Sequence, residues 1–412
     1  MLLALFVTYS LAVVPYTVES IMDIDGYGNG MYTQTRIGPY ANKLPLVSYL
    51  DATCGMLKAL KCENTNCTET SINIIDGNCN RVNGHIIETG KFESQAIGSD
   101  GFPIFAYYER ATLKMAHCGD PFCSDTDNIT RSIVDLRTTQ FTENGAYTAI
   151  TVGSDGFPLI AYHDVLDSSL NVASCDDLLC SSSTVTKLDA IGDAGGYPSI
   201  TVGNDGLPLI SFYSEGLEIL QLAVCADSKC REGHKASVKV LDDASSDVGR
   251  YNYIQIGSDG NPVIMYVDET NGWMKVLHCS TPHCDNGTIV ISVIDEIGIE
   301  AYGEFPEMQI NPLNGLPVLS YFNQTNSTSS NVKIAQCENI QCTSALVQVL
   351  GYGHCGYGRD SSLAFIDDYL YVSFMNYSPI ARLRRASLAV LKVTPSDKGN
   401  DVEFFKETNS YY

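Results

Sequence analysis

One stretch of the sequence decides the fold: Gly145-Ala-Tyr-Thr-Ala-Ile-Thr-Val-Gly-Ser-Asp-Gly-Phe-Pro-Leu-Ile-Ala-Tyr-His-Asp164. Its alternating run from Tyr147 to Val152 is typical of a half-buried strand. The turn Ser154-Asp-Gly156 follows, and glycine supplies the positive φ that such tight turns need. A second apolar run begins after Pro158, and a proline is tolerated at the start of a strand. The stretch therefore predicts an antiparallel hairpin.

The same pattern recurs along the chain at intervals of 50 to 58 residues. Its proline is found at Pro45, Pro103, Pro158, Pro208, Pro262 and Pro317, and a seventh, degenerate copy has Leu370 in that place. Each copy continues with a third and a fourth short strand, as at Leu170 to Ala173 and Val185 to Leu188. Four short strands repeated at this spacing describe one blade of a propeller. The sequence predicts an all-β, seven-bladed β-propeller with four antiparallel strands per blade.

The ends of the chain are expected to meet in the last blade. We expect the repeats to span 30-76, 90-135, 145-189, 195-242, 249-295, 303-350 and 356-393, with a propeller domain over 17-393 and an acidic tail over 394-412. The run Val18 to Asp25 resembles Val290 to Asp295, a fourth strand, so residues 17-25 are predicted to close the seventh blade and remove an open sheet edge. The alternative closure uses Val402 to Phe405.

Fourteen of the fifteen cysteines are predicted to form disulfides. Six repeats carry a Cys-x4-Cys pair between the third and fourth strands: Cys62 with Cys67, Cys118 with Cys123, Cys175 with Cys180, Cys225 with Cys230, Cys279 with Cys284, and Cys337 with Cys342. Zinc is the alternative, but this spacing is wide and the pairs lie in separate blades. Cys54 and Cys79 sit in loops that flank one blade and form the preferred seventh bridge. Cys355 remains, either free or available for an intermolecular disulfide.

Charge and export signals indicate a secreted protein. The chain of 412 residues has a net charge of −23, which argues against binding nucleic acid. Its apolar start, with small residues at Ser10 and Ala12, predicts a signal peptide over 1-12. No later apolar run reaches the roughly 18 residues of a membrane span. Six glycosylation sequons support an extracellular glycoprotein: Asn66, Asn128, Asn286, Asn323, Asn326 and Asn376.

The repeat resembles a unit of secreted multi-repeat proteins, Gly-x-Tyr-x-x-Ile-x-x-Gly-x-Asp-Gly-x-Pro-x-Ile-x-Tyr-Tyr-Asp…Leu-Lys-x-Ala. Here Tyr197 to Ser211 and Leu113 to Ala116 carry the resemblance, which covers nearly the whole chain. It implies a propeller-like fold and brings no catalytic residue. Sialidases are also propellers, but their Ser-x-Asp-x-Gly-x-Thr-Trp box is absent from the sequence.

Two series of repeated residues are candidates for binding. The first series closes the fourth strand: Asp25, Asp76, Asp135, Asp189, Asp242 and Asp295. These carboxylates could hold an amine or a calcium ion, although repetition favours hydrogen bonds within each turn. The second series opens the first strand: Tyr32, Phe92, Tyr147, Tyr197, Tyr251 and Phe305. Facing the channel, these rings could stack on a sugar; packing between blades is the favoured interpretation.

Departures from repetition point to one face of the propeller. The long loop with His85 and the basic run Arg382 to Arg385 both fall near blades 7 and 1. We expect the ligand there, with Arg382, Arg384, Arg385, His85, Asp25 and Asp76 as binding residues. Three histidines, His85, His163 and His354, could bind a metal only by converging from different blades. No cofactor other than calcium is suggested.

The favoured function is an extracellular binding or matrix protein whose partner is a glycan or another secreted protein. The alternative is an enzyme, a hydrolase or lyase that acts on a glycan or small molecule at the channel mouth. Acidic and basic residues that cluster asymmetrically there would indicate the enzyme. The symmetric Asp series does not provide such a cluster, so binding is favoured and catalysis stays open.

Overall fold

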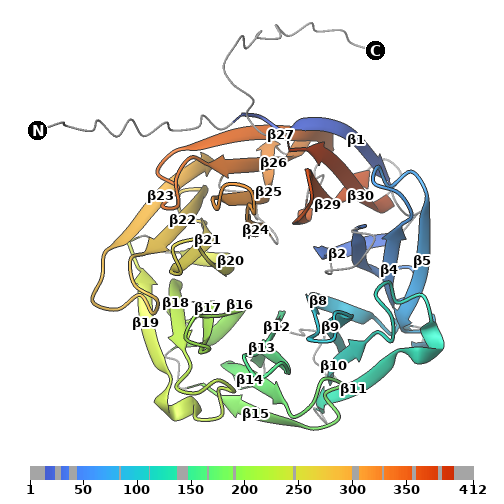
Figure 1. Ribbon diagram of the computed structural model, residues 1–412, viewed down its shortest axis with the longest axis horizontal. Helices are drawn as coiled ribbons and strands as arrows, with labels where there is room; N and C mark the ends of the chain where they lie inside the picture. Colours follow the sequence, from blue (N-terminus) through green and yellow to red (C-terminus); the bar gives the residue numbers. More distant parts are fainter. Residues whose placement is uncertain are drawn as a thin grey trace, which may run out of the picture.

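The computed structural model describes residues 14–23, 29–36, 44–82, 85–110, 112–136, 147–164, 167–188, 192–244, 247–298, 306–326, 329–354, 359–378 and 383–393. Their strands form seven four-stranded antiparallel sheets arranged around a central channel (Figure 1). The predicted fold, a seven-bladed β-propeller, is therefore confirmed. Among the described residues, no helix is long and apolar enough to cross a membrane.

The strands of each blade run in sequence order from the channel to the rim, apart from the outer strand of the last blade. Blade 1 is β2 (Asn29–Arg36), β3 (Leu46–Asp51), β4 (Met56–Cys62) and β5 (Thr70–Asp76); blade 2 is β8 (Thr89–Ile97), β9 (Pro103–Glu109), β10 (Thr112–His117) and β11 (Thr130–Asp135); blade 3 is β12 (Thr148–Val152), β13 (Pro158–Asp164), β14 (Ser169–Cys175) and β15 (Ser183–Lys187). Blade 4 is β16 (Ala194–Val202), β17 (Pro208–Ser214), β18 (Ile219–Val224) and β19 (Ser237–Asp242); blade 5 is β20 (Val248–Ile256), β21 (Pro262–Asp268), β22 (Trp273–Cys279) and β23 (Ile289–Glu296). Blade 6 is β24 (Glu307–Ile310), β25 (Pro317–Asn326), β26 (Ser329–Cys337) and β27 (Ala345–His354); blade 7 is β28 (Arg359–Ile366), β29 (Tyr369–Ser378), β30 (Leu383–Lys392) and β1 (Thr17–Asp23). A small hairpin, β6 (Arg81–Val82) with β7 (His85–Ile86), and two short 3₁₀ turns, Thr126–Asn128 and Gly233–Lys235, lie between blade strands.

The repeated turn forms as its residues require. In blade 3, Ile150 pairs with Ile160, and the backbone N–H of Gly153 donates to the carbonyl of Phe157 at 2.8 Å. Gly156 adopts φ +85° at the tip. The Asp155 carboxylate accepts from the backbone N–H of Phe157 at 3.0 Å, which holds the turn closed. This local geometry recurs in blades 2, 4 and 5.

The N-terminal strand completes the ring, as predicted. β1 pairs antiparallel with β30, and Ile21 lies opposite Ala389 (Figure 1). Asp23 accepts from the Ser387 hydroxyl at 2.7 Å. Tyr16 is buried just before this strand, and the Gln348 side chain of blade 6 makes hydrogen bonds of 2.9 and 3.1 Å to its backbone. The alternative strand, Val402 to Phe405, lies outside the described residues.

Seven disulfides join cysteines within the chain, as the sequence predicted. One links Cys54 to Cys79 across the loops beside blade 1. The other six link the two members of each Cys-x4-Cys pair: Cys62 to Cys67, Cys118 to Cys123, Cys175 to Cys180, Cys225 to Cys230, Cys279 to Cys284, and Cys337 to Cys342. Cys355 lies outside the described residues.

The second cysteine of each Cys-x4-Cys pair has a backbone conformation that the sequence analysis did not anticipate. Its φ is positive, between +52° and +54°, in all six hairpins: Cys67, Cys123, Cys180, Cys230, Cys284 and Cys342. The first cysteine ends or directly follows the third strand of its blade. The second donates its backbone N–H to the carbonyl three residues earlier, as Cys67 does to Asn64 at 3.0 Å. Each disulfide therefore ties a tight turn to the end of a strand and fixes one hairpin at the rim.

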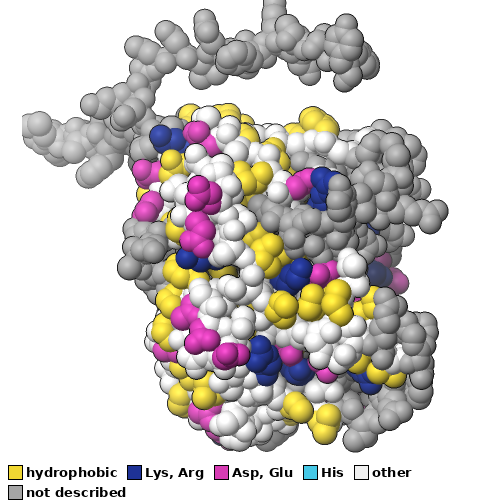
Figure 2. Space-filling view, turned by 90° about the vertical axis from the view of Figure 1, so that its right-hand side faces the viewer, with side chains coloured by type: hydrophobic (Ala, Val, Ile, Leu, Met, Phe, Trp, Pro, Cys, Tyr) yellow, Lys and Arg dark blue, Asp and Glu magenta, His cyan; other side chains and the backbone are white. Residues whose placement is uncertain are grey.

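The rim is a mixed surface. Figure 2 shows apolar side chains scattered among acidic and basic ones on the side that carries β5 and β11. The exposed apolar residues there include Ile72 and Ile74 of β5 and Ile133 of β11. The large buried aromatic residues instead belong mostly to the second strand of each blade, where they pack between neighbouring blades: Tyr49, Tyr107, Tyr162, Tyr213, Tyr266, Tyr321 and Tyr371.

Candidate functional site

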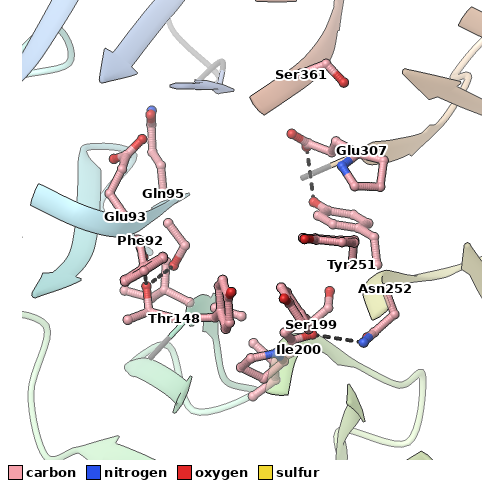
Figure 3. Close-up of a pocket in the computed structure, with 18 residues that line it drawn as sticks. Phe92, Glu93, Gln95, Thr148, Ser199, Ile200, Tyr251, Asn252, Glu307 and Ser361 are labelled. Carbon is pink, nitrogen blue, oxygen red and sulfur yellow. Dashed lines mark hydrogen bonds between the residues drawn. The ribbon is translucent and has the colours of Figure 1, made fainter. Parts of the chain in front are cut away.

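The channel contains an open cavity between the inner strands of blades 2 to 7, with a water-accessible volume of about 100 Å³. Its wall combines aromatic rings with a few polar side chains (Figure 3). The strands β8, β12, β16, β20, β24 and β28 supply these residues or immediately follow them, so the inner strands of the propeller hold the site in place.

A backbone bulge turns three of the aromatic residues into the channel. Gly195 has φ +110°, and Tyr197, two residues later, has φ +51°. The pairing between β16 and β17 shifts register at this point. A Cβ on Gly195 would lie 2.9 Å from the Cα of Leu170, so glycine is required there. Nearly the same two φ angles occur at Gly90 and Phe92 in blade 2, and at Gly249 and Tyr251 in blade 5. Positive φ at an aromatic residue is a strained conformation, and such strain is often kept at functional sites.

Four aromatic rings form a continuous arc along the channel wall, which we call the aromatic arc: Phe92, Tyr147, Tyr197 and Tyr251. Successive ring centroids are 4.8, 4.0 and 4.3 Å apart. The rings therefore pack across blade boundaries and line the cavity at the same time. The sequence-based preference for packing alone was incomplete, because the bulge that exposes the rings to the channel was not foreseen.

Glu93 is the first of two carboxylates in the cavity wall. Its side chain follows Phe92 on β8 and is only 3% exposed. Its Oε1 and the Oε1 of Gln95 each lie 2.7 Å from the hydroxyl of Ser48, on β3 of the preceding blade. One hydroxyl proton cannot serve both oxygens. Either Glu93 carries a proton and donates it to Ser48, or the Gln95 amide is reversed and donates instead.

Glu307 is the second carboxylate and lies across the open space from Glu93 (Figure 3). Its Oε1 accepts from the Tyr253 hydroxyl at 3.1 Å and from the Gln309 amide at 3.0 Å. Its Oε2 contacts the hydroxyl of Ser362 from blade 7. Donors around a carboxylate favour its ionised form. The two acids therefore lie in different environments. Such a difference is usual where one carboxyl group acts as an acid and the other as a base.

These carboxylates break the sevenfold repetition. Residues at the position of Glu93 in the following blades are Thr148, Pro198, Asn252, Pro306 and Ser361. Glu307 stands one position further along, where the other blades from 2 to 7 have Ser94, Ala149, Ser199, Tyr253 and Ser362. Asp360 of blade 7 replaces the arc aromatic and keeps its φ of +51°. These acids were not predicted, because the first strands were aligned only by their aromatic residues; comparing the one or two residues after Phe92 and Phe305 with those of the other blades would have revealed them.

The Asp series links neighbouring blades. Asp76, which ends blade 1, accepts from the Tyr107 hydroxyl of blade 2 at 2.7 Å and forms an ion pair with Lys114. Burial alone would raise the pKa of Asp76, but the hydrogen bonds from Lys114 and Tyr107 outweigh it and lower that pKa. The equivalent tyrosine contacts are Tyr162–Asp135, Tyr266–Asp242 and Tyr321–Asp295. The backbone N–H of Gly77 also donates to Asp76, as the favoured interpretation of this series expected.

The other predicted binding residues do not meet at the cavity within the described structure. Arg385 forms an ion pair of 2.6 Å with Asp23, which ties β30 to β1. Asp25 and the side chains of Arg382, Arg384, His85 and His354 lie outside the described residues. His163 is buried 3.6 Å from the Asp193 carboxylate. Among the described residues, no group of three or more His, Cys, Asp or Glu side chains is arranged to hold a metal ion.

Comparison with known proteins places the chain by its fold. No protein-family model matches it, and no curated protein matches its sequence. Among solved structures, the polysaccharide lyase Uly1 superposes with a TM-score of 0.52 at 9% identity, over 92% of this chain and all of that one. An α-L-arabinanase of Penicillium chrysogenum, complexed with arabinobiose, gives 0.48 at 12% identity over 92% and 98% of the two chains. At such identities the likeness concerns the propeller fold alone.

Proposed function

We propose that this protein is an extracellular glycan-cleaving enzyme whose active site is the channel cavity. The observation that carries the proposal is the pair of non-equivalent, buried carboxylates, Glu93 and Glu307, on opposite sides of an aromatic-lined pocket. Functional residues are expected to depart from structural repetition, and these two do. The seven disulfides fit an oxidising, extracellular compartment. The polysaccharide lyase among the similar structures is consistent with glycan chemistry on this fold.

The aromatic arc supplies the binding surface in this proposal. Sugar rings present flat C–H faces, and tyrosine rings offer large apolar faces with a polar hydroxyl at one end. Three of the four arc residues are tyrosines, and the bulge fixes the backbone at Phe92, Tyr197 and Tyr251 before a ligand arrives. Such preorganisation reduces the entropy that binding costs.

Hydrolysis of a glycosidic bond needs one carboxylic acid and one carboxylate that flank the bond. We assign the acid to Glu93, because proton donation to Ser48 is one of the two arrangements that satisfy its cluster. We assign the base or nucleophile to Glu307, which accepts from Tyr253 and Gln309. As the glycosidic C–O bond breaks, its oxygen takes the proton of Glu93 and leaves as a hydroxyl group. The sugar carbon is attacked either by a water molecule that gives its proton to Glu307, or by Glu307 itself; in the second case water then hydrolyses the glycosyl ester, with Glu93 as the base.

The test measures new reducing ends when the secreted full chain is incubated with a panel of plant, algal and animal polysaccharides. Glu93→Gln and Glu307→Gln keep the side-chain shape and are each expected to lower kcat by about 100-fold or more. Glu69→Gln, an exposed acid on the hairpin between β4 and β5, is the matched control and should leave kcat unchanged. Thermal unfolding of each variant verifies folding. Cleavage that survives both channel substitutions would contradict the proposal.

A second candidate function is glycan binding without cleavage, in a matrix or scaffold role. The aromatic arc favours it, because stacked rings are sufficient to hold a sugar. The same panel separates the two: saccharide binding that Tyr197→Ala abolishes, with no product formed from any bound substrate, supports binding alone.

A further inference from the structure

The ionisable side chains that line the cavity, among the described residues, are acidic or tyrosine side chains, and none is basic. The described residues that line it include two carboxylates, Glu93 and Glu307, and no lysine, arginine or histidine. Glu307 is 3% exposed and is the ionised acid of the proposed pair, so its charge acts where water screens poorly. A ligand carboxylate or sulfate beside it would be repelled, and no basic side chain of the described lining would offset that repulsion. A cationic group in the same place would be attracted.

The aromatic arc adds to this preference. The ring faces of tyrosine and phenylalanine carry negative electrostatic potential and attract ammonium groups. In the cavity, the arc from Phe92 to Tyr251 occupies one part of the wall, and Glu307 and Ser361 lie beyond its end (Figure 3). A ligand that fills the space would contact rings on one side and a carboxylate on the other.

A further polar side chain in the cavity wall, Ser361, is buried without a hydrogen-bond partner among the described residues. Ser361 is 2% exposed, and its hydroxyl has no hydrogen-bond partner among the residues that the structure describes. It lines the cavity near Glu307 (Figure 3). A buried hydroxyl without a partner costs free energy, and a polar ligand group would satisfy it.

We propose that the saccharide bound in this channel carries free amino groups, so that the substrate class is an amino-sugar glycan rather than a uronate-bearing or sulfated one. This inference rests on the proposed function and specifies its substrate. A protonated amine would lie between the Glu307 carboxylate and the ring faces, and the adjacent sugar hydroxyls would reach Ser361. The net charge of −23 also concentrates cationic ligands around the protein.

The experiment compares three hexasaccharides by titration calorimetry: a glucosamine hexamer, its fully N-acetylated form and an oligogalacturonate. The full chain with Glu93→Gln is used, so that the ligand is not cleaved while Glu307 keeps its charge. We expect the free-amine hexamer to bind about tenfold or more tightly than the acetylated one, a difference of about 1.4 kcal/mol. The preference should shrink as salt is raised. The oligogalacturonate should bind most weakly.

A second variant assigns the preference to the channel. Adding Glu307→Gln to Glu93→Gln should bring the affinity for the free-amine hexamer down to that for the acetylated hexamer. Adding Glu69→Gln instead removes the same charge from an exposed hairpin and should preserve the preference. Equal or tighter binding of the acetylated or anionic hexamer, weakened by Tyr197→Ala, would overturn the amino-sugar inference and keep the channel as a saccharide site. Failure of all saccharides to bind in the channel would overturn both proposals.

Discussion

Tyr147 and Tyr197 stack with their ring centroids 4.0 Å apart and their planes inclined by 29°, although they belong to different blades. Tyr251 continues the arrangement at 4.3 Å from Tyr197. Because each ring restricts its neighbour, the wall of the channel is fixed by contacts between blades. Binding at one ring therefore depends on the packing of the rings beside it.

Removing the central ring should impair saccharide binding. Tyr197→Ala is expected to weaken affinity about tenfold, because it removes a stacking face and frees Tyr147 and Tyr251 to move. Tyr197→Phe retains the ring and should lose much less affinity. Tyr352, which is 72% exposed on β27, provides the control substitution Tyr352→Ala. Titration calorimetry on folded variants measures the effect; undiminished affinity for Tyr197→Ala would exclude the arc as the binding surface.

The link between blades 1 and 2 should make stability depend on pH. Asp76→Asn removes the ion pair with Lys114 and is expected to cost about 2 kcal/mol at pH 7. The pKa of Asp76 is lowered in the folded state. Its contribution is therefore complete above the pKa of an unfolded aspartate, about 4, and is lost as the pH falls through the lower folded value.

Urea unfolding at pH 7 and at pH 3 measures this difference. The gap in unfolding free energy between wild type and Asp76→Asn should narrow at the lower pH. Asp127→Asn, in an exposed 3₁₀ turn, should change stability little at either pH. A gap that stays constant with pH would show that the charge of Asp76 does not stabilise the fold.

Deleting the N-terminal strand should open the ring. Without residues 14–23, β30 loses its partner β1 and Gln348 loses the backbone of Tyr16. We expect the yield of folded protein and the Tm to fall sharply, since an unpaired edge and buried apolar surface become exposed. Deletion of residues 394–412 is the comparison and should have a much smaller effect. Equal Tm values for the two deletions would contradict closure by β1.

Glycans should be attached to the sequon asparagines whose side chains are exposed, and not to one that is buried. Asn66, Asn128 and Asn286 are exposed near the rim hairpins, whereas Asn323 is 6% exposed within β25. When the chain is secreted from a eukaryotic host, peptide mass spectrometry should find glycans on the first three and none on Asn323. Substituting Asn323 with Gln should accordingly leave the glycan mass unchanged, while Asn66→Gln should reduce it. A glycan on Asn323 would require β25 to be arranged differently.

The fold could be predicted because each blade repeats the same local sequence pattern. Pro158 and Gly156 mark one hairpin, and their counterparts mark the others, so one correct interpretation applied to nearly the whole chain. Ring closure followed from a similar comparison between Val18 to Asp25 and Val290 to Asp295. The disulfide pairs were predictable in the same way, although the positive φ of the second cysteine was not, because spacing alone does not reveal backbone conformation.

The candidate site was harder to predict for two physical reasons. First, the alternating pattern of a strand predicts which side chains share one face of the sheet. The bulge at Gly195 shifts this alternation and turns Tyr197 toward the channel. Second, Glu93 and Glu307 are far apart in sequence and occupy different register positions, so only the ring brings them to one cavity. The aspartates that attracted notice by their repetition, such as Asp76, serve contacts between blades.

Closure by β1 has a consequence for the order of events in folding. Asp23 meets Ser387 only after the chain between them, a separation of 364 positions, has been synthesised. Contacts so distant in sequence form late, because they bring together remote parts of the chain. Ser361 and Ser362, which complete the cavity around Glu307, belong to the same last blade. A chain that lacks the last blade therefore has an incomplete pocket, and full ligand affinity would report that synthesis and ring closure are finished.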